Sequence, residues 1–282
     1  MILHRIFLAS AVLLTCLGCG SNEPAQFNPP TKGPVEATDS ADERTADPKT
    51  PAEVIEAAIE AHGGESTFAK ANIGQTTMTI DGAFQPGMSG QFTKFDIFDL
   101  PGKHKRTVKG EAQGQKLDMN VVINGDEAWM QMNGGEPTLL PVINPGQGVY
   151  PNDNLGVLLA LKGSDFQLSV GLTHIIDGRP VHRIRMETGG QWVGDSFFDE
   201  ETHLLVASKK KLSDDTIGES RAIETYYSDY KRVDGLNLPM SIRMVMDGET
   251  MATITVTEVK FMDEIDDGVF AKPVVRNERE AE

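Results

Sequence analysis

The sequence predicts a mainly β protein with a few short helices, in which one strongly curved antiparallel sheet carries helices against its inner face. Apolar and polar residues alternate along successive segments after residue 74, and dipeptides such as Asp234-Gly235 and Asp247-Gly248 mark turns between them. Connections this short join antiparallel neighbours, because a parallel crossover needs about a dozen residues or more. Two apolar helical segments then remain to cover the apolar face of the sheet.

The first predicted element is a helix that begins at Pro51. Thr50 is placed to cap it, Pro51 suits the first helical position, and Glu53 completes a capping box with Thr50. Gly63-Gly64 ends the helix. One face carries Val54, Ile55, Ala58, Ile59 and His62. This apolar stripe predicts that the helix packs against another element.

Segments with β periodicity follow the helix. In the hairpin around Asp247-Gly248, the side chains of Ile242, Met244 and Met246 share one face before the turn, and those of Ala252, Ile254 and Val256 share one after it. The predicted strands are 75–84, 90–99, 103–110, 115–123, 128–132, 166–172, 181–187, 191–198, 203–212, 221–230, 238–246 and 251–261.

The stretch from Pro151 to Gly163 interrupts the strands and predicts a second short helix. Asn152 or Asp153 can cap its start, and Gly163 ends it. Three leucines, Leu155, Leu158 and Leu159, lie on one face of this helix. We therefore expect it to lie against the inner face of the sheet, as the first helix does.

Residues 1–18 predict a lipoprotein-type signal peptide. The apolar run from Ile6 to Leu17 is too short to span a bilayer as a mature helix. Leu17-Gly18-Cys19 resembles the lipobox of bacterial lipoproteins, which implies that Cys19 is acylated and anchors the chain to a membrane. The two residues after Cys19 include no Asp that would retain the product at the inner membrane, so the resemblance implies the outer membrane, facing the periplasm. Cleavage at Cys16, or an ordinary signal peptide with an incidental Cys19, are the alternatives.

The composition of the rest of the chain predicts one folded domain between two disordered segments. Residues 19–50 are rich in Pro, Glu, Asp, Ser and Thr and predict a disordered tether, and residues 274–282 predict a disordered tail. The folded domain is expected at 51–273. It contains no cysteine, which excludes a disulfide, a thiolate nucleophile and a cysteine metal ligand.

The charge balance argues against polyanionic partners. The chain has 42 acidic and 26 basic side chains and a formal net charge of −16. Nucleic acids and anionic membrane surfaces prefer the opposite sign, so we expect neither nucleic-acid binding nor electrostatic docking to a membrane. The local basic stretch from Lys103 to Lys109 is interpreted as a solvated strand face.

Several segments resemble the outer-membrane lipoprotein-sorting family, the LolA/LolB-like proteins. SFFDEETHLLVASKKKL, YYSDYKRVDGLNLPMSIRM and TVTEVKFMDEIDDGVFAKP carry the resemblance, and VVINGDEAWMQMNGG and PAEVIEAAIEAHGG are similar to segments of planctomycete-type relatives. The resemblance spans Pro51 to Pro273. It implies an unclosed half-barrel of about eleven antiparallel strands, with helices plugging its concave face and an apolar cavity for lipid or acyl chains. Cys19 places the chain closer to the family's receptor, itself a lipoprotein, than to its soluble carrier.

Methionines in the predicted strands indicate which side chains line such a cavity. Methionine is flexible and polarizable, so a methionine-rich wall can repack around varied apolar ligands. The predicted lining is Trp129, Met130, Met132, Leu155, Leu158, Leu159, Met186, Ile242, Met244 and Met246. We predict a monomeric, membrane-anchored envelope protein that binds lipid or lipoprotein acyl chains in this cavity and aids outer-membrane lipoprotein or lipid transport. The alternative is an envelope interaction module with a filled core and no ligand.

An enzyme is the third hypothesis, and the sequence argues against it. Gly194-Asp195-Ser196 resembles the GDS block of one esterase family, but it lies inside a hairpin and lacks that family's C-terminal Asp and His partners. The histidines His104, His174, His182 and His203 have no metal-ligand spacing, and the chain has no HExxH, P-loop or GxSxG motif. We predict no catalytic activity, no cofactor and no metal site.

Overall fold

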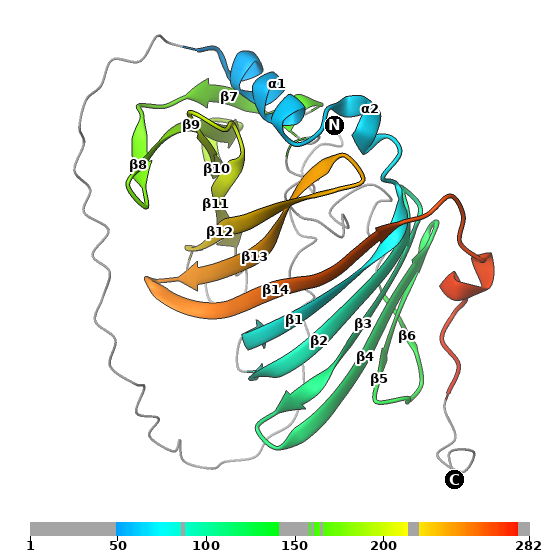
Figure 1. The fold of residues 1–282 in the computed structure, drawn as a ribbon. Helices are drawn as coiled ribbons and strands as arrows, with labels where there is room; N and C mark the ends of the chain where they lie inside the picture. The colour runs from blue at the N-terminus through cyan, green and yellow to red at the C-terminus, as the bar shows by residue number, and fades with distance from the viewer. Residues whose placement is uncertain are drawn as a thin grey trace, which may run out of the picture.

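A computed structural model of the chain describes residues 49–85, 88–140, 158, 161–163, 166–213 and 220–275. One curved antiparallel sheet dominates it, and two helices, α1 (Pro51–Ala61) and α2 (Glu65–Phe68), lie at one end of this sheet (Figure 1). The predicted signal peptide, Cys19 and the tether up to residue 48 lie outside the described residues, as do residues 276–282. Within the described ranges, no helix is long and apolar enough to cross a membrane.

Within the described residues, the sheet has 14 strands. The first group is β1 (Ile73–Gln85), β2 (Met88–Asp99), β3 (Lys103–Ala112), β4 (Gln115–Asn124), β5 (Glu127–Met132) and β6 (Thr138–Leu139). The second group is β7 (Gln167–Val170), β8 (His174–Ile176), β9 (Arg179–Thr188), β10 (Gln191–Asp199), β11 (Leu205–Ser213), β12 (Ser220–Val233), β13 (Leu236–Met246) and β14 (Glu249–Phe261). The expected number of about eleven strands is therefore wrong, although the antiparallel, mainly β class is confirmed. Two short strands, β6 and β8, have no counterpart among the predicted segments because two or three residues are too few for a periodicity signal.

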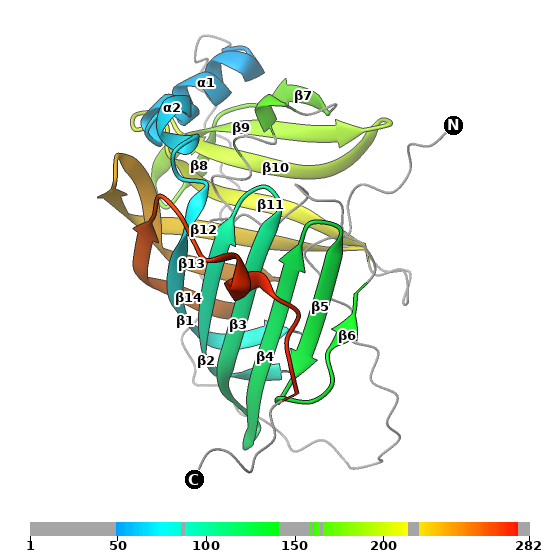
Figure 2. The same cartoon turned by 90° about the vertical axis from the view of Figure 1, so that its right-hand side faces the viewer.

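The strands follow the order β6-β5-β4-β3-β2-β1-β14-β13-β12-β11-β10-β9-β7, and β8 pairs with β9. Antiparallel pairing of β1 with β14 joins the two ends of the folded chain at the middle of the sheet. The strands at the ends of this order, β6 and β7, do not pair with each other within the described residues. The sheet is thus strongly curved but unclosed (Figures 1 and 2).

Tight hairpins connect many neighbours, as the turn dipeptides predict. At the β12–β13 turn, Asp234 and Gly235 have φ angles of 47° and 89°, and at the β13–β14 turn, Asp247 and Gly248 have φ angles of 53° and 81°. Two consecutive positive φ values define the turn type that matches the twist of a two-residue hairpin, and Asp-Gly tolerates them well. These predicted turns are confirmed.

Helix α1 forms as its N-terminal sequence predicts. The Thr50 hydroxyl accepts a hydrogen bond from the Glu53 backbone N–H (3.3 Å), and the Glu53 carboxylate accepts one from the Thr50 N–H (2.7 Å). The apolar stripe from Val54 to Ile59 is buried. The helix therefore starts at a satisfied cap and gains the rest of its stability from packing.

The largest core cluster lies between α1 and one face of the sheet, which we call the inner face. Leu158 and Leu161 have helical backbone conformation and are buried in this cluster, and Lys162 forms an ion pair with Glu65 of α2. The remaining buried members are Val54, Ile55, Ala58, Ile59, Phe68, Ile184, Met186, Phe198, Leu205, Tyr227, Leu236, Leu238 and Ile242. Both predicted helical segments thus contribute side chains to the inner face.

A smaller cluster covers the opposite, outer face of β4 and β5. The 3₁₀-helix η1 (Asp267–Phe270) crosses this face (Figure 2) and buries Phe270 against Val122 and Trp129. Beyond η1, the buried Gln131 amide donates a hydrogen bond to the Val274 carbonyl (2.8 Å). This contact lies one residue beyond the predicted end of the folded domain.

Candidate functional site

The inner face stays apolar from β13 across to β4. Directly opposite residues of an antiparallel pair project to the same side of the sheet. The row of opposite residues that starts at Ile242 in the first core cluster is Ile242, Ile254, Ile80, Phe92, Gly110 and Leu117. This row passes into the second core cluster, which is Ile80, Phe92, Val108, Ala112, Leu117, Met119, Val121 and Ala252. One face therefore carries both clusters.

Gly110 explains how the Phe92 ring fits on this face. A Cβ atom at residue 110 would lie 2.5 Å from Cδ1 of Phe92 and 2.3 Å from the carbonyl oxygen of Gln91. Both separations are far below van der Waals contact, so the absent side chain leaves the room that the ring occupies over β3. The glycine thus permits a large aromatic ring in the middle of the sheet.

Methionines gather on the inner face of β1, β4 and β5. Met78 and Met119 are buried, and Met130 and Met132 are partly buried against the second core cluster. Register places Met78, Lys94, Val108, Met119 and Met132 in one row across five strands. The predicted lining residues Met130 and Met132 therefore lie on the inner face.

The other predicted lining residues of the described part lie nearer α1 and at the β13–β14 end. Met186, Leu158 and Ile242 belong to the first core cluster. Met244 and Met246 are half-buried, belong to neither cluster, and lie opposite Thr225 and Ile223 of β12. Leu155 and Leu159 lie outside the described residues.

The prediction that Trp129 lines the same face is wrong. Trp129 lies opposite Val122 on β4 and packs with Val122 and Phe270 in the outer-face cluster. Its neighbour Met130 points to the inner face, because successive side chains of a strand alternate. The alternation was visible in the sequence, but the cover that η1 gives to the outer face was not.

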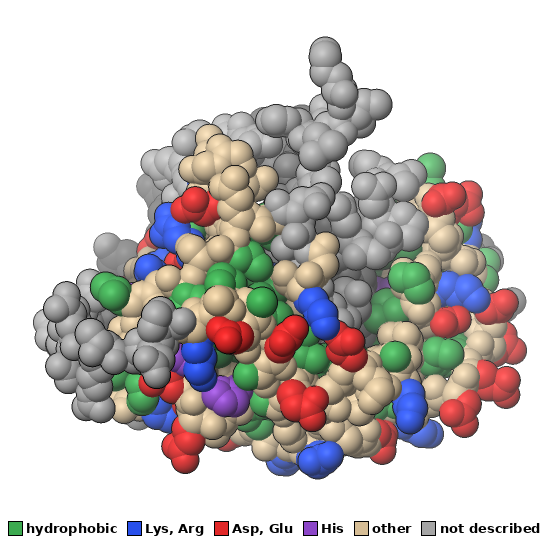
Figure 3. All heavy atoms as spheres, turned by 90° about the horizontal axis from the view of Figure 1, so that it is seen from above, with side chains coloured by type: hydrophobic (Ala, Val, Ile, Leu, Met, Phe, Trp, Pro, Cys, Tyr) green, Lys and Arg blue, Asp and Glu red, His purple; other side chains and the backbone are tan. Residues whose placement is uncertain are grey.

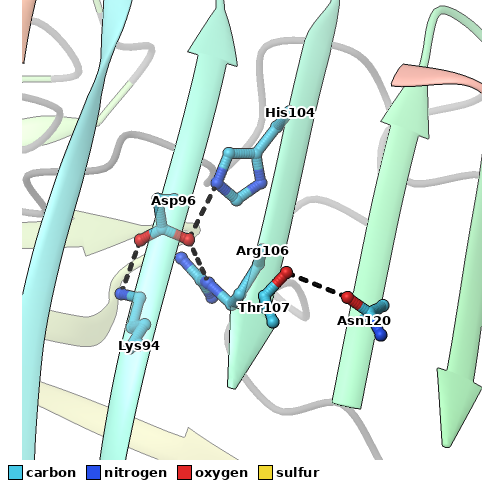
Figure 4. A network of polar contacts seen from close by, with 6 residues as sticks. All are labelled: Lys94, Asp96, His104, Arg106, Thr107 and Asn120. Carbon is cyan, nitrogen blue, oxygen red and sulfur yellow. Dashed lines mark hydrogen bonds and ion pairs between the residues drawn. The ribbon is translucent and has the colours of Figure 1, made fainter. Parts of the chain in front are cut away.

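A buried polar network interrupts the apolar inner face between β2 and β3 (Figure 4). Asp96 is at its centre, with its side chain 0% exposed. Arg106 Nε donates a hydrogen bond to Asp96 Oδ1 (2.8 Å), His104 Nε2 lies 3.1 Å from the same oxygen, and Lys94 Nζ lies 3.1 Å from Oδ2. The side chains of His104, Lys94 and Arg106 are 3%, 15% and 30% exposed.

These residues share the inner face with the methionines. Asp96 lies opposite Thr76 of β1 and Arg106 of β3, and Arg106 lies opposite Val121 of β4. Lys94 occupies the row of Met78 and Met119 described above. The network is therefore a charged island within the methionine-rich part of the inner face.

The charges of the network follow from its geometry. Burial alone would raise the pKa of Asp96, but the charges of Arg106 and Lys94 and the hydrogen bond from His104 hold that pKa well below its usual value. Burial lowers the pKa of His104, so its ring is neutral near pH 7. Because the ionised carboxylate can only accept, His104 donates through Nε2–H and its Nδ1 carries the lone pair.

Three polar atoms of this island have no hydrogen-bond partner among the described residues. They are the Thr76 hydroxyl, Oδ2 of Asp96 and Nδ1 of His104. The Lys94 ammonium is close to Oδ2, but the contact does not have hydrogen-bond geometry. Buried polar atoms without partners are uncommon in folded proteins and point to a functional site or a bound group.

The charge pattern of the network corrects the interpretation of residues 103–109 as a solvated face. Lys109 projects outward and pairs with Asp118 (3.4 Å), as that interpretation expects. His104 and Arg106, however, project inward to Asp96. Sequence analysis missed all four members of the network, although hairpin register around Leu100–Lys103 brings Asp96 opposite Arg106.

The residues of the esterase-like block do not assemble a catalytic site. Asp195 and Ser196 are neighbours on β10, so their side chains project to opposite faces. Ser196 lies fully buried opposite Ile184 and Ser208, and its hydroxyl has no hydrogen-bond partner among the described residues. His203 lies in the β10–β11 turn, where its backbone N–H donates to the Asp199 carbonyl. Among the described residues, no group of three or more His, Cys, Asp or Glu side chains could hold a metal ion.

The surface near the α1 end carries charges of both signs. Seen from above in Figure 3, acidic and basic side chains are intermixed, and hydrophobic side chains show between them. Among the described residues that this view shows, the basic side chains form no continuous patch of the kind that binds nucleic acid.

Solved structures share the architecture described above. A LolA superfamily protein from Nitrosomonas europaea is 13% identical, with a TM-score of 0.52, over 79% of this chain and 98% of that chain. A predicted outer membrane lipoprotein-sorting protein domain from Vibrio parahaemolyticus is 9% identical, with a TM-score of 0.51, over 79% of this chain and 97% of that chain. The chain has the LolA-type fold.

The LolA-type fold extends to a further group of proteins. A DUF1329 family protein from Desulfovibrio piger is 10% identical, with a TM-score of 0.50, over 82% of this chain and all of that chain, 100%. No protein-family model matches the sequence, and no curated protein does. The expected LolA/LolB-like architecture is thus confirmed at the level of the fold, whereas the planctomycete-type resemblance stays a prediction.

Proposed function

We propose that this chain is an envelope protein that binds the hydrocarbon chains of lipids or of lipoprotein acyl groups on its inner face. The observation that carries the proposal is the continuous apolar inner face of an unclosed, strongly curved sheet. Its row from Ile242 to Leu117 crosses six strands without a charged side chain. A closed, filled barrel would offer no such face to a ligand.

The methionines of this face suit a ligand with flexible chains. Met130, Met132, Met244 and Met246 are each half-buried, so part of each side chain has no described neighbour to pack against. Flexible thioether side chains can adjust to chains of different length and saturation. The proposed lining is therefore Met130, Met132, Met244 and Met246. Of the other predicted lining residues, Met186, Leu158 and Ile242 pack in the first core cluster, and Leu155 and Leu159 lie outside the described residues.

The N-terminal sequence supports a place at a membrane. In the proposal, Cys19 carries the acyl anchor, the tether up to residue 50 gives the domain reach, and the monomeric domain faces the periplasm at the outer membrane. The structurally similar domain from Vibrio parahaemolyticus is an outer membrane lipoprotein-sorting protein domain by prediction. A related role, aiding lipoprotein or lipid transport, is the function we propose for this chain.

A filled-core interaction module is the second candidate function. The observation that favours it is the first core cluster, in which Leu158, Leu205 and Leu238 are fully buried. Such burial leaves no room for a ligand beneath α1. In the first proposal, the ligand therefore lies on the methionine-rich part of the face, away from this cluster.

Extraction of bound lipid tests the proposal directly. A fragment of residues 50–275 keeps the Thr50 cap and the Gln131–Val274 contact and has no acyl anchor of its own. We expect organic extraction of the purified fragment, followed by mass spectrometry, to release lipids or fatty acids in stoichiometric amounts. A fragment that carries no lipid and binds none when lipids are added would contradict the proposal and favour the filled-core module.

A further inference from the structure

The charged network on the inner face needs an explanation that stability alone does not provide. Burying an ion pair costs desolvation energy that the attraction between the charges often fails to offset, and apolar side chains of similar volume are frequently as stable. Asp96, Lys94 and Arg106 nevertheless occupy two rows whose other members on β1, β3 and β4 are Met78, Val108, Met119 and Val121, with Thr76 as the one uncharged polar residue. A ligand with a charged group that binds on this face would account for the presence of these three charged side chains.

Asp96 holds the basic side chains toward the interior. Its fully buried carboxylate receives Arg106 and His104 at one oxygen and has Lys94 beside the other (Figure 4). Without this carboxylate, a lysine side chain at residue 94 would extend toward solvent, because a free ammonium is strongly hydrated. Asp96 therefore positions the Lys94 ammonium but does not occupy all three N–H donors of that ammonium.

Lys94 has donor capacity left for a ligand. An ammonium group has three N–H donors, and the described residues offer Lys94 one ion-pair partner, Oδ2 of Asp96, without hydrogen-bond geometry. The hydroxyl of Thr76, which lies opposite Asp96 on the neighbouring strand, is a second donor without a described partner. An anionic oxygen can accept from both groups.

We propose that Lys94 and Thr76 form a subsite for the anionic head group, a carboxylate or a phosphate, of an amphiphile whose hydrocarbon chain lies on the methionines of the inner face. The chain would extend toward the half-buried Met132, which continues the row of Lys94 across β5; between them in this row lie Val108 and Met119, which are buried. The subsite rests on the proposed function and adds to it the class of ligand and its orientation. Asp96 acts as a positioning residue.

Matched ligands and variants test this subsite in the full chain. Calorimetric titration compares laurate, lauryl phosphate and lauryl alcohol, which share one hydrocarbon chain and differ in head group. We expect the wild-type protein to bind at least one of the two anionic ligands roughly tenfold or more tightly than the alcohol, because a charge-assisted hydrogen bond is stronger than a neutral one. The anion that binds more tightly identifies the head group.

Two substitutions on the inner face should remove this preference. Lys94→Met replaces the ammonium by a side chain like its neighbours, and Thr76→Val removes a hydroxyl while all charges remain. We expect Lys94→Met to bind the three ligands with equal affinity, and Thr76→Val to lose part of the preference. Lys109→Met, which removes an outward-facing lysine of β3, should keep the wild-type preference. Unchanged cooperative unfolding of each variant controls for misfolding.

Each other result overturns a different part of the reasoning. Equal affinity of the wild-type protein for all three ligands would overturn the head-group subsite and leave the proposed function intact. Absence of binding to any of them would overturn both. Displacement of laurate by an equal concentration of inorganic phosphate or acetate would show a site for small free anions and overturn the role of the chain. An anion preference that survives in both Lys94→Met and Thr76→Val would place the charge recognition elsewhere.

Discussion

The substitution Asp96→Asn tests how the inner face holds its charges. The change keeps the size of the side chain and an oxygen that can accept from Arg106, so it opens no cavity. It removes the negative charge, however, and leaves the Lys94 and Arg106 cations near each other on an apolar face. Breaking a buried ion pair by removing one partner costs about 3–5 kcal/mol. The side chains of Lys94 and Arg106 are 15% and 30% exposed, so water can partly solvate their charges in the variant. We therefore expect Asp96→Asn to lower the free energy of unfolding by about 3 kcal/mol, the lower end of this range.

Denaturant unfolding measures this cost, and Asp99→Asn is the matched control. Asp99 lies three residues along the same strand and pairs with Lys103 at 3.6 Å, but both side chains are about one-third exposed, 31% and 29%. An ion pair of this kind contributes about 0–1 kcal/mol. We therefore expect the free energy of unfolding to fall clearly more for Asp96→Asn than for Asp99→Asn. Equal losses for the two variants would refute the role of Asp96 as a buried ion-pair partner of Lys94 and Arg106.

The effect of Asp96 should also depend on pH in a defined direction. The pKa of Asp96 in the folded protein lies well below the unfolded value of 3.8. The ionised carboxylate therefore stabilises the fold fully above the unfolded pKa, and this stabilisation is lost as the pH falls from that value through the folded pKa. The difference in unfolding free energy between the wild type and Asp96→Asn should be constant from pH 7 to pH 5 and shrink below pH 3.8. A difference that grows on acidification would contradict this assignment.

Three further predictions concern the cap, the proposed wall and the anchor. Thr50→Ala should lower the free energy of unfolding by about 1 kcal/mol, because it removes the side-chain cap of α1; an unchanged denaturation midpoint would contradict this. Leu238→Ala should cost about 2–5 kcal/mol, whereas Met244→Ala, half-buried and outside both core clusters, should cost clearly less and change the affinity for a fluorescent fatty acid; equal costs would favour a filled core. Metabolic labelling with a fatty acid should mark the wild type and miss Cys19→Ser, and equal labelling of both would contradict the anchor.

The regular part of the fold could be predicted from local sequence because each element carries its own signal. The capping box at Thr50 and the Asp-Gly turns at Asp234 and Asp247 fix chain conformation within a few residues. Alternation along β13 and β14 then identifies which residues share a face. Strand number was not predictable in the same way, because β6 and β8 are defined by their partners β5 and β9 rather than by a periodic pattern of their own.

Which face points inward depends on contacts that local sequence does not specify. In β2, Phe92 and Phe98 lie on the inner face, whereas Ile97 packs against the outer-face cluster under η1. Apolar residues therefore occur on both faces of β2. The two-residue period shows which residues share a face, but it does not show which of the two faces points to the interior. The wrong face predicted for Trp129 has the same cause. Its cover, η1, comes from a segment about 140 residues further along the chain, so local sequence around Trp129 does not reveal it.

The charged network could be found only by combining periodicity with register. Taken alone, Lys94 and Asp96 look like the solvated side of β2, and residues 103–109 look like the solvated side of β3. The short turn between these strands, however, fixes their register, so that Asp96 must lie opposite Arg106 and Phe98 opposite His104. Phe98 is buried on the inner face, and Asp96 lies two residues before it on the same side. Because alternate side chains of a strand share a face, a strand that buries Phe92 and Phe98 also turns Lys94 and Asp96 to that apolar face. The buried Asp96 carboxylate then needs basic partners, and the register supplies them from β3.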